Sequence, residues 1–122
     1  MSNTLQIRMD AIIDNESLYE TFQVRQLQID LNSVGMHKPI INVGTSEEVI
    51  DFGDIYTPGY VFFKNMSSND NITIGPESGG NMVPIINLNP GEVACMRLDP
   101  SVVLRAKSDT YESQLLMMLL ED

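Results

Sequence analysis

The sequence has few of the residues on which most catalytic and metal sites depend. Its 122 residues include one cysteine, one histidine and no tryptophan. The single cysteine, Cys95, excludes a disulfide within the chain. The single histidine, His37, excludes a zinc cluster built on several histidines and a pair of histidine acid/base catalysts. No Gly-x-Ser-x-Gly nucleophile motif occurs, and no apolar run approaches the roughly 20 residues of a membrane span.

Basic residues are also scarce. Seven Lys and Arg residues stand against seventeen Asp and Glu residues, which gives a formal net charge of −10. Proteins that bind nucleic acids or anionic membranes carry a basic stripe, and none is visible here. We therefore expect no direct nucleic-acid partner and no membrane partner. The stretch Met1–Leu5 lacks the charged and apolar parts of a secretory signal, so we expect no secretion by a signal peptide.

What the sequence does contain is a series of short β-prone segments separated by turn residues. Segments at a spacing of roughly ten residues predict an all-β fold, an antiparallel sandwich or barrel with about nine or ten short strands. Residues 60–64 are the most β-prone, and we expect residues 72–74 to return as their partner strand. Residues 84–88 and 92–98 flank Asn89-Pro90-Gly91, which we interpret as a hairpin loop.

We interpret the first 31 residues as a long hairpin or arm within a single domain that spans residues 1–122. Leu5, Ile7, Met9 and Ala11 alternate with polar residues, as in a half-buried strand. Apolar residues then change parity within residues 21–31, which a β-bulge near Arg25-Gln26 would explain.

Two segments leave strand and helix as competing interpretations. In residues 17–28, Ser17 and Glu20 fit a capping box at the start of a helix, but the β-rich context favours a strand. In residues 111–120, the residues of the run Leu-Leu-Met-Met-Leu-Leu have a high helix propensity, and the run shows no periodicity that would distinguish a helix from a strand. We favour a strand there too, with its outer face against another layer or another subunit.

Several residues attract a chemical interpretation. The acidic cluster Glu47, Glu48, Asp51 and Asp54 offers oxygen ligands for calcium, but its spacing does not match an EF-hand loop. Acidic side chains also protect an exposed strand edge, and we favour that role. We interpret Asn69-Asp70-Asn71 as the polar tip of a hairpin.

The remaining candidates have simple structural interpretations. We expect Cys95 to be a small buried residue and His37 an ordinary surface residue. Residues 75–80 are glycine-rich but lack the lysine and the following helix of a phosphate-binding loop, so we interpret them as a flexible loop. We expect the eight methionines to fill the core. We therefore predict no catalytic, cofactor-binding or metal-binding residues.

The order of features from Gly59 onward is similar to a known family. Gly-Tyr-Val-Phe-Phe-Lys-Asn (59–65) is followed by Asn-Ile-Thr-Ile-Gly (71–75), Pro-Ile-Ile-Asn-Leu-Asn-Pro-Gly-Glu-Val-Ala (84–94) and Leu-Arg-Ala-Lys-Ser-Asp-Thr (104–110), then by a closing apolar segment that ends in Leu-Glu-Asp. This arrangement resembles small structural proteins of tailed-bacteriophage particles, of the decoration or cement type. The resemblance covers residues 59–122.

The resemblance implies an antiparallel β-sandwich that is jelly-roll-like, and a non-enzymatic virion protein that is assembled in the host cytoplasm. It would stabilise the head through contacts with other virion proteins, chiefly the major capsid protein, as a homo-oligomer and preferably a trimer. The alternatives are a neck, tail or fibre component, or a small carbohydrate- or peptide-binding β-sandwich. A cupin-like enzyme is disfavoured because its metal site needs several histidines.

Overall fold

The computed structural model describes residues 4–33 and 35–122, and these residues contain twelve strands and no helix. All paired strands are antiparallel, which confirms the prediction of an all-β, antiparallel sandwich. The contacts between Cα atoms divide the chain into two compact units, residues 1–33 and residues 34–122. The twelve strands exceed the nine or ten that the sequence predicts.

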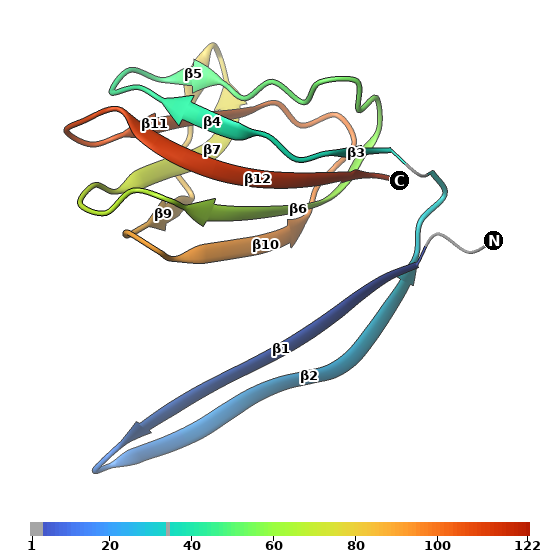
Figure 1. The fold of residues 1–122 in the computed structure, drawn as a ribbon, viewed down its shortest axis with the longest axis vertical. Coiled ribbons are helices and arrows are strands. Elements are labelled where there is room, and N and C mark those ends of the chain that lie inside the picture. The colour runs from blue at the N-terminus through green and yellow to red at the C-terminus, as the bar shows by residue number, and fades with distance from the viewer. Residues whose placement is uncertain (1–3, 34) are drawn as a thin grey trace. The chain divides into compact units, whose positions relative to one another are not determined.

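The first unit is a long two-stranded hairpin (Figure 1). Strand β1 (Thr4–Asn15) pairs with β2 (Leu18–Asp30) over its whole length. The turn is closed by Asn15, whose Oδ1 accepts a hydrogen bond of 3.0 Å from the backbone N–H of Ser17. Residues 18–28 lie in β2, so the interpretation of residues 17–28 as a strand is confirmed and the capping-box helix is wrong.

The hairpin contains the β-bulge that the sequence predicts. Ile7 lies opposite Leu27, whereas Met9 lies opposite Val24. Two residues of β2, Arg25 and Gln26, therefore face the single residue Arg8 of β1. A bulge of this kind changes the parity of one strand relative to its partner. It allows the apolar residues on both sides of the bulge to lie on the same face of the hairpin.

The second unit is a sandwich of two sheets (Figure 1). Its strands are β3 (Met36–His37), β4 (Ile40–Val43), β5 (Glu48–Val49), β6 (Pro58–Asn65), β7 (Ile72–Ser78), β8 (Asn81–Met82), β9 (Ile86–Leu88), β10 (Val93–Arg97), β11 (Leu104–Ser108) and β12 (Ser113–Glu121). The first sheet has the order β10-β6-β12, with β3 and β4 both paired to β12. The second sheet has the order β5-β11-β7, with β8 and β9 both paired to β7.

The strand pairs show jelly-roll topology. When β3 and β8 are set aside, the first remaining strand of the sandwich pairs with the last, as β4 with β12. The second remaining strand pairs with the second from last, and so on inward: β5 with β11, β6 with β10 and β7 with β9. The second unit is therefore one long antiparallel ribbon folded over itself, and successive strands belong to alternate sheets, except β7 to β9, at the end of the ribbon.

This topology corrects two predicted hairpins. Residues 60–64 lie in β6 of the first sheet and residues 72–74 lie in β7 of the second, so they are not partners. Likewise, Asn89-Pro90-Gly91 joins β9 of the second sheet to β10 of the first. Both segments cross between sheets. Turn residues indicate that a strand ends, but they do not show which sheet the next strand joins.

The core lies between the inner faces of the two sheets. Alternate residues of β12 are fully buried there, namely Leu115, Met117 and Leu119. They pack in one cluster with Phe63 of the first sheet and Ile74 of the second. The interpretation of residues 111–120 as a strand is therefore confirmed. Met117 fills the core as expected, but Met9, Met36 and Met66 are exposed, so the expectation is wrong for these methionines.

Two glycine-containing segments also differ from expectation. Residues 75–80 are not one flexible loop, because Gly75 to Ser78 belong to β7. Gly79 and Gly80 have φ angles of 62° and 82° and form a tight turn to β8. Positive φ at both central positions is typical of the turns that join hairpin strands, and glycine adopts it without strain.

Candidate interaction surfaces

One face of the hairpin is apolar along its entire length. In an antiparallel pair, residues directly opposite each other point to the same side. The register therefore places ten apolar side chains on one side, which we call the hairpin apolar face. They are Leu5, Ile7, Met9, Ala11 and Ile13 from β1, and Leu18, Phe22, Val24, Leu27 and Ile29 from β2.

The bulge is what makes this face continuous. Without it, Leu27 and Ile29 would point to the opposite side from Phe22 and Val24. The opposite side of the hairpin carries mainly polar and charged residues, among them Gln6 paired with Gln28. On the apolar side, the charged exception among the described residues is Glu20, which lies opposite Ile13.

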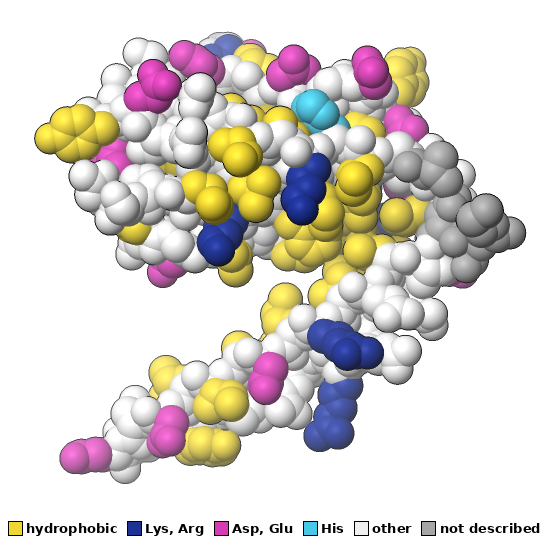
Figure 2. All heavy atoms as spheres, viewed as in Figure 1, with side chains coloured by type: hydrophobic (Ala, Val, Ile, Leu, Met, Phe, Trp, Pro, Cys, Tyr) yellow, Lys and Arg dark blue, Asp and Glu magenta, His cyan; other side chains and the backbone are white. Residues whose placement is uncertain are grey.

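The hairpin apolar face is largely open to solvent. Phe22 is 62% exposed, Ile13 is 49% exposed and Leu18 is 46% exposed. Figure 2 shows such hydrophobic side chains along the hairpin. A two-stranded hairpin by itself is only marginally stable in water. A contiguous apolar surface of this kind marks a site of contact with another surface.

The second apolar surface is the outer face of the first sheet in the sandwich. Its residues alternate along each strand with those of the core, and we call this surface the outer sheet face. Its apolar members are Met36, Ile40, Tyr60, Phe62, Val93, Cys95, Leu116, Met118 and Leu120. Figure 2 shows hydrophobic side chains gathered over this sheet.

Two basic side chains lie within the outer sheet face. Arg97 forms an ion pair with Asp122 and lies over the ring of Tyr60, 5.3 Å from its centroid. Lys64 is exposed and lies opposite Val93 and Leu116 in the register. Lys64 has no ion-pair partner among residues 4–33 and 35–122. It is therefore a cation available to an incoming acidic group.

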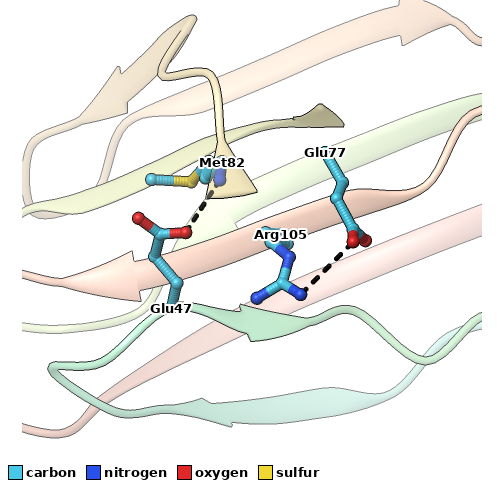
Figure 3. Close-up of polar contacts among 4 residues, drawn as sticks. All are labelled: Glu47, Glu77, Met82 and Arg105. Carbon is cyan, nitrogen blue, oxygen red and sulfur yellow. Dashed lines mark hydrogen bonds and ion pairs between the residues drawn. The ribbon is translucent and has the colours of Figure 1, made fainter. Parts of the chain in front are cut away.

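The outer face of the second sheet is different because polar and charged side chains alternate with the core residues of β11. Arg105 Nη2 lies 3.4 Å from Glu77 Oε1, and both side chains are partly exposed (Figure 3). Nearby, Glu47 accepts a hydrogen bond of 2.7 Å from the backbone N–H of Met82 (Figure 3). Lys107 lies opposite Thr73 on the same face. This side of the sandwich therefore carries polar and charged side chains along β7 and β11, with the exposed apolar residues Val49 and Val103 beside them.

A polar network at one end of the sandwich corrects the interpretation of residues 69–71. Asp70 is not part of a solvated hairpin tip, since it is only 5% exposed. Its carboxylate accepts hydrogen bonds from the backbone N–H groups of Tyr111 at 2.7 Å and Thr110 at 3.0 Å. The hydrogen bond from Tyr111 is the main cause of the lowered pKa of Asp70, and burial opposes it.

The same network contains a fully buried asparagine. Asn65 Nδ2 donates to the carbonyl oxygens of Asp70 at 2.8 Å and Leu88 at 2.9 Å. Asn65 ends β6 of the first sheet and Leu88 ends β9 of the second. The network therefore ties the two sheets together, and its groups are occupied in holding the fold. Nothing in the sequence near residue 70 indicates this burial.

The acidic cluster does not come together as an ion site. Among the described residues, no group of three or more His, Cys, Asp or Glu side chains is arranged to hold a metal ion. Asp51 Oδ1 instead accepts a hydrogen bond of 2.8 Å from the backbone N–H of Gly53. Glu48 lies in β5, at the edge of the second sheet, which suits the favoured role of edge protection.

The two remaining single residues are partly buried. His37 is part of the short strand β3, and its ring lies close to Gly53. Cys95 is half-buried on the outer sheet face, opposite Phe62, rather than fully buried as expected. Burial raises the pKa of the Cys95 thiol, which disfavours the reactive thiolate.

Comparison of the chain with protein-family models, curated proteins and solved structures finds no match. In the described part of the chain, no helix has the length and apolar character needed to cross a membrane. The features that the structure offers for function are therefore the two apolar surfaces. The continuous apolar run of residues 115–120 indicates the outer sheet face in the sequence, as does the two-sided apolar pattern of residues 60–63.

Proposed function

We propose that this chain is a non-enzymatic structural protein of a tailed-bacteriophage particle, a capsid decoration or cement protein that stabilises the head. The observation that carries the proposal is the hairpin apolar face, ten apolar side chains on an exposed element outside the core. An element of this kind gains stability when another protein covers it. The order of strands and turns after Gly59, which resembles such virion proteins, supports the same function.

The chemistry of the sandwich supports a role in contact rather than in catalysis. The buried carboxylate of Asp70 is held by backbone donors, and the Cys95 thiol has a raised pKa. A net charge of −10 suits a partner with a basic surface, and we propose the major capsid protein as that partner. In this proposal the chain is assembled into particles in the host cytoplasm as a homo-oligomer.

The proposal is tested on particles purified from infected cells that express the tagged chain. We expect the chain to sediment with the particles at a fixed ratio to the major capsid protein. Phe22→Glu, on the hairpin apolar face, should reduce this association at least tenfold, because it places a charge on the surface on which assembly depends. Thr21→Glu adds the same charge on the opposite side of the hairpin and should have little effect.

Three results would count against the proposal. The chain would be absent from purified particles, or it would be present at a variable, trace ratio, or Phe22→Glu would associate as well as the unaltered chain. Gold labelling of the tag then distinguishes placements, because a decoration protein labels the head, whereas a neck, tail or fibre component labels the other parts.

A further inference from the structure

We infer that the hairpin apolar face of one chain docks on the outer sheet face of a second copy of the same chain. The sandwich of each copy would thus gain a third layer from its neighbour's hairpin. This inference rests on the same hairpin apolar face as the proposed virion function. It assigns that face to contacts between copies, and the resulting oligomer would be the form that joins the particle.

The two surfaces match in chemistry. Each is a flat sheet surface with aliphatic side chains and at least one aromatic ring, such as Phe22 on the hairpin and Phe62 on the sandwich. Strand β12 is apolar on both sides, with Met117 in the core and Met118 on the outer sheet face. Strands that are apolar on both sides occur where both faces of a sheet are covered.

The surfaces also match in charge. Glu20 is the charged residue within the otherwise apolar side of the described hairpin, and it lies opposite Ile13. Lys64 lies within the outer sheet face without an ion-pair partner in the described structure. Docking of the two faces brings a single carboxylate to a single free ammonium group. A charge that leaves water at an interface needs such a partner.

This charge pattern argues against hairpins that dock on one another. In that arrangement, Glu20 of each copy would face a second hairpin apolar face. The described members of that face, from Leu5 to Ile29, include no basic residue. The carboxylate would then be covered by apolar groups and left unpaired, which is unfavourable. The outer sheet face contains Lys64, so it is the better docking partner for the hairpin apolar face.

The size of the surfaces favours an exchange in which every copy gives a hairpin and receives one. A 12-residue strand is about 40 Å long and two strands are about 10 Å wide, so one docked hairpin covers a footprint of about 400 Å². A standard protein interface buries about 800 Å² per partner. Reciprocal exchange in a dimer, or cyclic exchange in a trimer, gives each copy two such footprints and reaches this area.

The first test measures the solution mass of the purified full chain by light scattering over a range of concentrations. We expect a closed oligomer for the unaltered chain. Phe22→Glu on the hairpin and Met118→Lys on the outer sheet face should each shift the dissociation concentration upward at least tenfold. The controls are Thr21→Glu on the polar side of the hairpin and Asn87→Glu on the second sheet, which should leave it unchanged. Circular dichroism verifies that each variant is folded.

The second test uses a charge exchange, which distinguishes the proposed contact from a general loss of folding. Glu20→Lys and Lys64→Glu should each weaken association roughly tenfold, and the double variant should restore most of the loss. Restoration requires that the two side chains meet. If the double variant is as weak as the worse single variant, the proposed contact is wrong.

The third test uses the single cysteine of the chain, which lies within the outer sheet face. A chain with Cys95→Ser and Ala11→Cys is mixed with the unaltered chain, and a short bis-maleimide reagent is added. Each chain then has one thiol, so a cross-link between the two kinds of chain can form only between copies. We expect this mixed product, and it should disappear in the presence of Phe22→Glu.

Other results overturn the inference. A chain that is monomeric at all concentrations would show that the hairpin is covered in some other way. An oligomer broken by Phe22→Glu but not by Met118→Lys would indicate contacts between hairpins. These outcomes are independent of the virion proposal, because a monomer can still sediment with particles and an oligomer can be absent from them.

Discussion

The two sheets of the sandwich share one core but have different outer faces. Strand β11 of the second sheet alternates buried residues such as Ala106 with the polar residues Arg105 and Lys107. Strand β12 of the first sheet alternates buried Met117 with Met118, so its outer side is apolar as well. Both strands satisfy the same inward pattern that the fold requires.

The two sheets therefore differ in the side chains on their outer faces. The second sheet carries an ion pair between Arg105 and Glu77 on its outer side. The first sheet leaves apolar side chains and Lys64 to meet another surface. In a jelly roll, the inner faces are determined by packing, whereas the outer faces are free to vary. The function of this chain is accordingly to be sought on the outer face of the first sheet and on the hairpin.

The largest expected effect comes from the second sheet, where the link between β8 and β9 lies against Gly75 of β7. A Cβ atom added at Gly75 would lie 1.9 Å from the carbonyl oxygen of Val83 and 3.2 Å from the backbone nitrogen of Ile85. Backbone atoms cannot move aside as a flexible side chain can. We expect Gly75→Ala to lower the free energy of unfolding by about 3 kcal/mol or more, measured by urea denaturation.

The matched control for this change is Gly44→Ala. The nearest atom to a Cβ at Gly44 is Glu48 Oε1 at 3.5 Å, an ordinary contact. Its free energy of unfolding should change by less than about 1 kcal/mol. If Gly75→Ala were as stable as Gly44→Ala, the close approach of residues 83–85 to β7 would be incorrect.

A smaller effect is expected where the two sheets are joined, at Asp70. Asp70→Asn removes the negative charge that accepts the N–H groups of Tyr111 and Thr110. We expect the melting temperature at pH 7 to fall by about 5 °C or more. Because the pKa of Asp70 is lowered from its ordinary value of 3.8, its contribution is present above that value and is lost as the pH falls through the lower pKa of the folded state.

The pH dependence provides the control. The difference in melting temperature between the unaltered chain and Asp70→Asn should be constant from pH 7 to about pH 5 and should shrink as the pH falls below 3.8. Other carboxylates titrate in both proteins, so the comparison isolates residue 70. A difference that stays constant to pH 2 would contradict the assigned role of its charge.

Local patterns in the sequence predict the strands of this fold well. Alternation in residues 5–11 and the change of parity near Arg25 and Gln26 predict both the hairpin and its bulge. The same features contain most of the information about the hairpin apolar face. These predictions succeed because a hairpin is built from neighbouring residues, and its register depends on its own side chains.

The pairing within the sandwich cannot be predicted in this way. The turn Asn89-Pro90-Gly91 has the composition of a hairpin loop, yet it connects two sheets. The sheet that each strand joins is decided by pairing with other strands, since β9 pairs with β7 and β10 pairs with β6. The buried state of Asp70 has the same origin, because its donors, Thr110 and Tyr111, lie about 40 residues further along the chain.

The smallest expected effect is that of a substitution at Glu77. It tests whether the polar side chains on the outer face of the second sheet stabilise the fold or only keep that side soluble. Glu77→Gln removes the charge that faces Arg105 Nη2 at 3.4 Å but keeps the shape of the side chain. A single ion pair of this length at a surface contributes little, so we expect the free energy of unfolding to fall by about 0.5 kcal/mol or less in urea denaturation. The oligomeric state should stay the same, in contrast to Met118→Lys on the first sheet. A loss above about 2 kcal/mol would show that this pair supports the sandwich. The contrast between the two outer faces would then be one of stability as well as of contact.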